Sequence, residues 1–239
     1  MFLQWICARS LPLEPSQGSL VSPAGARVNA GQAAFTKTTL AIYDWFVLGF
    51  TCHLVWRCST EHTLALYRRH LSGNHLEVGV GTGFFLDRSC FPISRPRLGL
   101  LDLNPDCLDR TARRVSRYQP EIYQANVLAP IQMDVPPFDS VGLNYVLHCL
   151  PGAFPEKGIV FAHLKTLLNP GGVLFGSTLL QGGVPRSALA RASMRLYNTR
   201  QVFCNERDDV DGLVRALEQH LEDVQVETIG CVAQFSGRA

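Results

Sequence analysis

Residues 75–83 read His-Leu-Glu-Val-Gly-Val-Gly-Thr-Gly, a short strand pattern that runs directly into a glycine-rich turn. The three alternating glycines let the backbone turn sharply and let a ligand press closely against it. In an open α/β sheet, ligands bind beyond the carboxyl ends of the strands, where such a turn leads into a helix. The stretch therefore predicts both the first strand of an α/β sheet and a ligand site at its end.

Strand and helix patterns continue to alternate outward from this turn. Further strands are predicted at 98–102, 121–125, 138–145 and 173–179, followed by 224–229 and 232–235 as a hairpin around Gly230. Asn104 and Pro105 mark the start of one intervening helix, and Gly73 is expected to end another in a left-handed conformation. Right-handed crossovers place helices on both faces. The sequence thus predicts an α/β fold, a doubly wound, mostly parallel seven-stranded sheet with a terminal antiparallel hairpin.

The remaining segments define the predicted domain organisation. Residues 1–36 are interrupted by Pro, Ser and Gly and are poor in acidic residues. An organellar transit peptide shares part of this composition, but a disordered N-terminal arm is the prediction here. Residues 37–239 are predicted to form a single domain. Within it, 37–72 is a helical cover ahead of the sheet and 183–205 is an inserted helical lid.

Composition excludes several classes of protein. The 239 residues carry a formal net charge of +2, which is too small to argue for a nucleic-acid or membrane partner. The apolar run 45–56 is shorter than the roughly 20 residues that a membrane span needs. None of the eight cysteines has C-x-x-C or zinc-finger spacing. We therefore expect reduced thiols, no metal site and a cytoplasmic location.

Four arginines share one stretch of the chain, namely Arg110, Arg113, Arg114 and Arg117. Asp106 and Asp109 stand four residues before the first two, as in helical ion pairs. This spacing favours a solvated helix face over an RNA-binding stripe.

Two cofactor classes use a glycine turn after the first strand of such a sheet. The dinucleotide fingerprint G-x-G-x-x-G would need a third glycine at residue 84 or 86, and these positions hold Phe84 and Leu86. The nicotinamide register is therefore not satisfied. Asp102 ends the second strand, where a carboxylate can accept hydrogen bonds from both hydroxyls of a ribose.

Five segments resemble the motifs of class I S-adenosylmethionine-dependent methyltransferases, small-molecule type, in that family's order. They are the glycine turn 77–83, the acidic loop 101–105, the adenine loop 125–127, the start of strand four at 138–141 and the turn 168–174 before strand five. Together they lie within residues 70 to 180. The resemblance implies a Rossmann-like methyltransferase fold with S-adenosylmethionine as the cofactor.

The resemblance also implies roles for particular residues. The cofactor-binding positions are Glu77, Gly79, Val80, Gly81, Thr82, Gly83, Asp102, Leu103, Asn126, Val127, Asn144 and Tyr145. The glycines would cradle the methionine and ribose, Glu77 would organise their loop, and Asp102 would bind the ribose. Asn126 and the Val127 amide would meet the adenine, although the family more often has aspartate at 126, and Asn126 also suits an ordinary turn. Asn144 and Tyr145 would face the methionine portion.

His148 is the candidate general base, because it follows the fourth strand where the two reactants should meet. Its ordinary pKa of about 6.5 suits proton removal near neutrality. The alternative is a histidine that only packs in the strand-to-helix loop. Aromatic residues in 40–56 and 183–205 predict a small, partly apolar acceptor molecule. Two rival functions remain open: a catalytically inactive, cofactor-binding regulator of a partner protein, and a nicotinamide-dependent oxidoreductase.

Overall fold

Seven strands form one mixed sheet in the computed structural model, which describes residues 53–239. The strands are β1 (Asn74–Val78), β2 (Arg97–Asp102), β3 (Glu121–Gln124), β4 (Phe138–Asn144), β5 (Leu168–Leu179), β6 (Glu222–Ile229) and β7 (Val232–Arg238). Their order is β3-β2-β1-β4-β5-β7-β6, and only the pairs made by β7 are antiparallel. The predicted fold class is confirmed. The predicted arm 1–36, and the helical cover up to residue 52, lie outside the described residues.

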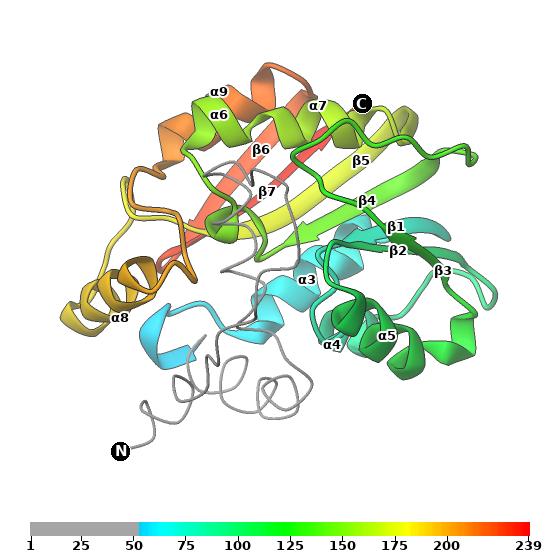
Figure 1. Ribbon diagram of the computed structural model, residues 1–239, viewed down its shortest axis with the longest axis horizontal. Coiled ribbons are helices and arrows are strands. Elements are labelled where there is room, and N and C mark those ends of the chain that lie inside the picture. The colour runs from blue at the N-terminus through cyan, green and yellow to red at the C-terminus, as the bar shows by residue number, and fades with distance from the viewer. Residues whose placement is uncertain (1–52) are drawn as a thin grey trace, which may run out of the picture.

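Helices cover both faces of the sheet, as Figure 1 shows. One face carries α3 (Thr60–His70), α4 (Phe84–Arg88) and α5 (Pro105–Arg114), and the other carries α6 (Phe154–Lys157), α7 (Ile159–Lys165) and α9 (Val210–Glu218). Strand β2 shows why both faces need cover. Leu98 and Leu100 join the apolar cluster of α3 and α5, whereas Leu101 joins that of α7 and α9. The continuous apolar strand thus supplies two cores.

The helical part of the 183–205 insertion is α8 (Ala188–Thr199), which lies apart from the helices on the two faces (Figure 1). The Ser187 hydroxyl accepts from the Ala190 amide and begins this helix. The chain then returns to the sheet, where the side-chain Nδ2 of Asn205 donates to the Leu179 carbonyl at 3.0 Å. The insertion is therefore attached to the end of β5.

Two local predictions need correction. Gly73 does not adopt a left-handed conformation, because α3 ends earlier, with Leu71 in extended conformation as its cap. Strand β5 begins at Leu168 rather than Val173, because the predicted turn is a register shift inside the strand where Gly171 has φ +76°. The Asn104 cap of α5 is confirmed, since its side chain accepts from the Asp106 amide.

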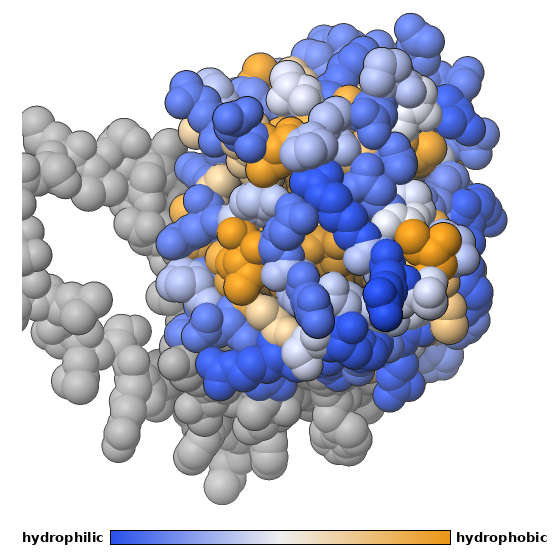
Figure 2. Space-filling model, turned by 90° about the vertical axis from the view of Figure 1, so that its right-hand side faces the viewer, coloured by the Kyte–Doolittle hydropathy of each residue, from blue (hydrophilic) through white to orange (hydrophobic). Residues whose placement is uncertain are grey.

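The surface near β3 and α5 is mainly polar. Figure 2 shows that apolar side chains on the coloured part of this side form separate patches among polar ones. Among the described residues, no helix is both long and apolar enough to cross a membrane. In the same part of the chain, no group of three His, Cys, Asp or Glu side chains is placed to hold a metal ion.

Candidate active site

The glycine turn between β1 and α4 presents one open face. Gly79, Gly81 and Gly83 all have positive φ, at +67°, +53° and +72°. A Cβ atom on Gly79 would lie 2.2 Å from Val146, and one on Gly83 would lie 2.8 Å from Thr111. A Cβ on Gly81 would meet nothing within 4 Å. The outer glycines are therefore required by packing, and Gly81 faces the space a ligand could fill.

Asp102 lies at the end of β2, directly beside this turn. Its carboxylate accepts a hydrogen bond from the Asn104 amide at 2.8 Å. Burial raises the pKa of Asp102, although hydrogen bonds from the backbone amides of Asn104, Gly81 and Val80 oppose the rise. The two strand ends thus meet at a carboxylate, as the sequence predicted.

Two side chains contact the carboxylate of Glu77, one from α3 and one from β1 itself. One carboxylate oxygen accepts from the Tyr67 hydroxyl, and the other lies 3.0 Å from His75 Nε2. The His75 Nδ1 atom lies 2.8 Å from the Ser140 hydroxyl. Both carboxylate oxygens of Glu77 are therefore contacted by protein side chains, directly before the turn begins.

The adenine-loop residues follow β3. Asn126 closes a turn, because its Oδ1 atom accepts from the Leu128 amide at 3.0 Å. The Val127 carbonyl lies 2.8 Å from His163 Nδ1 on α7, which anchors the loop. A carbonyl oxygen has a second lone pair, so the Asn126 side chain retains acceptor capacity.

The carboxyl end of β4 carries two predicted residues with unusual settings. Asn144 Oδ1 accepts from the Ser177 hydroxyl at 3.0 Å. Its buried Nδ2 interacts with the Tyr67 hydroxyl but makes no hydrogen bond of regular geometry among the described residues. Tyr145 has φ +57°, a conformation that non-glycine residues rarely adopt. Such backbone strain is concentrated at functional sites. The Tyr145 hydroxyl lies 3.3 Å from the Thr63 hydroxyl on α3.

His148 is buried one turn further along, in the short helix Leu147–Cys149. Burial, together with the charge of Lys157, lowers the pKa of His148 to about 3. The expectation that it titrates near its ordinary pKa is therefore wrong, because sequence spacing says nothing about solvent access. Its Nδ1 atom has no hydrogen-bond partner within residues 53–239.

Aromatic rings form a continuous wall from the glycine turn to the insertion. The wall consists of Phe84, Phe85, Tyr145, His148, Phe203, Tyr197 and Trp56. Phe203 packs edge-on against His148 with 4.6 Å between ring centroids, and Trp56 lies 6.1 Å from Phe203. Trp56, from the described part of the first predicted acceptor segment, and Tyr197 and Phe203, from the second, therefore both reach the end of β4 through this wall.

Sequence reasoning missed the side chains that hold these residues in place. Tyr67 and His75 fix Glu77, Ser177 fixes Asn144, and His163 fixes the loop after β3. Tyr67, Ser177 and His163 each lie on a different element from the group that they contact, so no spacing rule within one element could have paired them. His75 lies two residues before Glu77 on the same strand, and only this pair follows a spacing rule, the i, i+2 relation.

Comparisons with known proteins agree with this geometry. A family model described as a methyltransferase domain matches residues 76–174. Demethylluteothin O-methyltransferase of Streptomyces thioluteus is 44% identical over 84% of this chain and 88% of its own length. The physcion biosynthesis cluster O-methyltransferase of Aspergillus chevalieri is 36% identical over 86% of this chain and 93% of its own.

A solved structure shares the fold. N-methyltransferase NodS of Bradyrhizobium japonicum, in complex with S-adenosyl-L-homocysteine, superposes with a TM-score of 0.55 and 17% identity. That match covers 75% of this chain and 85% of the other. Because the relatives described above are methyltransferases, the alternative of a nicotinamide-dependent oxidoreductase is set aside. The chain belongs to the class I S-adenosylmethionine-dependent methyltransferases of the small-molecule type, and S-adenosylmethionine is its cofactor.

Proposed function

We propose that this enzyme methylates a hydroxyl group of a small, planar, partly apolar acceptor, with His148 receiving the hydroxyl proton. The observation that carries the proposal is the unpartnered Nδ1 of a buried His148 inside an aromatic wall. Buried polar atoms are almost always hydrogen-bonded, so a ligand group is the expected partner. A hydroxyl can satisfy either tautomer of the ring, because it both donates and accepts. Two relatives are named O-methyltransferases, which supports the same acceptor atom.

The cofactor fits the residues at the strand ends. We assign its methionine and ribose portion to the turn 79–83, with Gly81 as the open backbone face, and its ribose hydroxyls to Asp102 and the adjoining Leu103 backbone. The Nδ2 atom of Asn144 carries two hydrogens, and beyond its interaction with the Tyr67 hydroxyl it has one left to donate to the methionine carboxylate. Asn126 and Val127 take the adenine edge. Bound there, S-adenosylmethionine supplies an activated methyl group on a positively charged sulfur.

The protein's part in the reaction is alignment and one proton transfer. His148 would take the hydroxyl proton as the acceptor oxygen receives the methyl group that the bound cofactor supplies. The imidazole would then carry the positive charge until the proton is released to solvent. Because the lowered pKa makes His148 a weak base, the chemistry favours an acidic hydroxyl, such as a phenol or enol. The aromatic wall excludes water and aligns a flat acceptor.

The acceptor atom can be tested with compounds of matched shape. Naphthol, naphthylamine and naphthalenethiol differ only in the nucleophile, so a panel with labelled S-adenosylmethionine separates the chemistry from the fit. We expect methyl transfer to the hydroxyl compound. Transfer confined to the amine or the thiol would contradict the proposal. Mass spectrometry of a metabolite extract, incubated with enzyme and cofactor, then identifies which natural compound gains one CH2.

Replacing Gly81 by alanine should weaken cofactor binding without unfolding the protein. The new Cβ meets no protein atom, and the left-handed φ costs only about 1–2 kcal/mol of stability. Because the methyl group enters the ligand space, we expect the affinity for S-adenosylhomocysteine, measured by calorimetry, to fall at least roughly tenfold. Gly171→Ala is the matched control, since its φ is +76° and its Cβ also meets nothing. Equal affinity losses in the two variants would contradict the assignment of Gly81.

Replacing His148 by phenylalanine should lower kcat with naphthol by roughly 100-fold or more and leave the affinity for S-adenosylhomocysteine unchanged. In the wild type, the pKa lowered to about 3 keeps the imidazole unprotonated as the solution is acidified. We therefore expect kcat/KM to stay level from about pH 7 to about pH 5, where an ordinary histidine would become protonated. His62→Phe, at an exposed position on α3, is the control. Full turnover of the His148 variant would dismiss its role as a base.

A further inference from the structure

Helix α4, which follows the glycine turn, is too short to hold itself. It has five residues, Phe84–Arg88, and begins at Gly83 without a side-chain cap. Isolated helices of this length are unstable, because nucleation fixes several dihedrals for few hydrogen bonds. Its last turn is closed by the Ser89 hydroxyl, which donates to the Phe85 carbonyl at 2.7 Å. The turn and α4 therefore depend on contacts from elsewhere in the fold.

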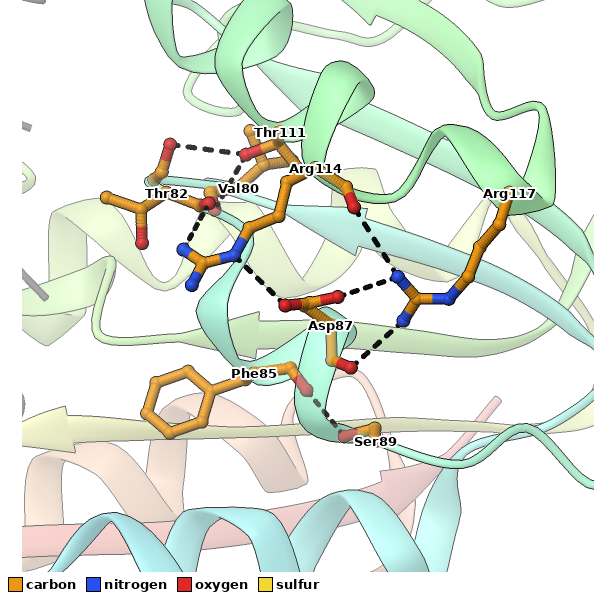
Figure 3. Close-up of polar contacts among 9 residues, drawn as sticks. Val80, Thr82, Phe85, Asp87, Ser89, Thr111, Arg114 and Arg117 are labelled. Carbon is orange, nitrogen blue, oxygen red and sulfur yellow. Dashed lines mark hydrogen bonds and ion pairs between the residues drawn. The ribbon is translucent and has the colours of Figure 1, made fainter. Parts of the chain in front are cut away.

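Those contacts come from α5 and the residues directly after it, as Figure 3 shows. The Thr111 hydroxyl lies 3.5 Å from the Val80 carbonyl and 3.3 Å from the Gly81 carbonyl. Arg114 Nη1 donates to the Thr82 carbonyl at 3.0 Å. Three successive carbonyls of the glycine turn thus face α5. The turn is also closed from within, because the Gly83 amide donates to the Val80 carbonyl at 2.9 Å.

Arg114 also connects the turn to α4. Its Nε atom donates to the Asp87 carboxylate at 3.3 Å, and its guanidinium lies 5.6 Å from the Phe84 ring centroid. Arg117 donates to the same carboxylate at 2.6 Å and to the Asp87 carbonyl at 2.9 Å (Figure 3). Burial raises the pKa of Asp87, but hydrogen bonds from Arg117 and Arg114 outweigh it and lower the pKa overall.

This arrangement corrects the expectation of a solvated arginine face. Arg113 fits that expectation, because it pairs with Asp109 on the same helix and is 74% exposed. The Arg114 side chain is 25% exposed and pairs with α4 instead. Neighbouring arginines on one helix therefore have different tasks.

We propose that Arg114 is a positioning residue for the cofactor, because it fixes the Thr82 carbonyl and α4 together and so holds the glycine turn in its binding conformation. The proposal rests on the assignment of the cofactor to this turn. Arg114 itself contacts neither cofactor nor acceptor in this scheme. Its loss should therefore change cofactor affinity and leave the chemical step intact.

The test compares Arg114→Met with Arg113→Met, which removes an exposed arginine from the same helix. Calorimetry with S-adenosylhomocysteine should show roughly tenfold weaker binding for Arg114→Met, about 1.4 kcal/mol, and no change for Arg113→Met. With naphthol as acceptor, KM for S-adenosylmethionine should rise, while kcat at saturation stays within about twofold. Arg114→Lys should recover only part of the affinity. It keeps the positive charge, but an ammonium cannot bridge Thr82 and Asp87 as a planar guanidinium does.

Several results would overturn the proposal. They are wild-type affinity in Arg114→Met, an equal loss in Arg113→Met, or a fall in kcat with unchanged KM for the cofactor. If Arg114→Met does not fold, Thr111→Val removes the neighbouring hydroxyl contacts at constant volume and should weaken binding in the same direction. Hydrogen exchange of the backbone amides reports on the turn and α4 without relying on activity. The rates in residues 79–89 are compared with those in α5, residues 105–114. If the wild type itself fails to bind, the assignment of the cofactor to the turn fails instead.

Discussion

Replacing Lys157 by methionine is expected to lower the free energy of unfolding by about 3–5 kcal/mol. The Lys157 and Asp208 side chains are both 0% exposed, with 2.5 Å between Nζ and a carboxylate oxygen. The second Asp208 oxygen has no partner in the described part of the chain. Burial lowers the pKa of Lys157 and raises that of Asp208 to about 6. Removing the lysine therefore leaves a buried carboxylate with only the more distant charge of Arg207 to offset its desolvation.

The ion pair is also connected through Cys204 to His148, which we assign to the acceptor. Lys157 Nζ donates to the Cys204 carbonyl at 3.3 Å, and the Cys204 amide donates to the His148 carbonyl at 2.7 Å. Loss of the pair should therefore raise KM for the acceptor more than KM for S-adenosylmethionine, in whatever fraction of the variant remains folded.

Urea unfolding measures the effect, and two variants serve as controls. Arg207→Met breaks the exposed pair with Glu156, whose charged atoms are 4.0 Å apart, and should change stability by less than about 1 kcal/mol. Lys157→Met combined with Asp208→Leu should recover most of the lost stability, because two apolar side chains leave no buried charge. A single Lys157→Met variant as stable as the wild type would show that the pair is not anchored as described.

Replacing Asp102 by alanine is expected to weaken the binding of S-adenosylhomocysteine by roughly 100-fold, about 3 kcal/mol. The carboxylate lies at the end of β2 beside the glycine turn, where it can accept from two ribose hydroxyls. The affinity of Asp102→Asn should lie between those of the wild type and Asp102→Ala. The asparagine side chain keeps one oxygen to accept from the Asn104 backbone amide but has no charge.

A thermal-shift panel with S-adenosylhomocysteine and NAD checks this result. The wild type should be stabilised by the first compound only, and Asp102→Ala should lose that shift. Asp109→Ala, on the exposed face of α5, is the control for general effects of removing a carboxylate. Full affinity in Asp102→Ala would remove this residue from the site.

Much of the architecture follows from short-range patterns. The predicted strands lie within two residues of the observed ones at most ends, because apolar runs and glycine or proline breaks act over a few residues. The hairpin around Gly230 is confirmed by its φ of +58°. Register inside β5 was missed, because Phe138 pairs with Leu168 across a shift that only the neighbouring strand imposes.

Local patterns in the sequence predicted the positions of the strands along the chain, the glycine turn and the acid at the end of β2, because these depend on residues close together in the chain. The order of the strands in the sheet, and the distant side chains that share one environment, became known from the folded structure. It paired Lys157 with Asp208, directed Arg114 to the glycine turn, and buried His148 deeply enough to lower its pKa to about 3. Charge, burial and hydrogen bonding depend on distances in space, and these arise only when the helices have packed on the sheet.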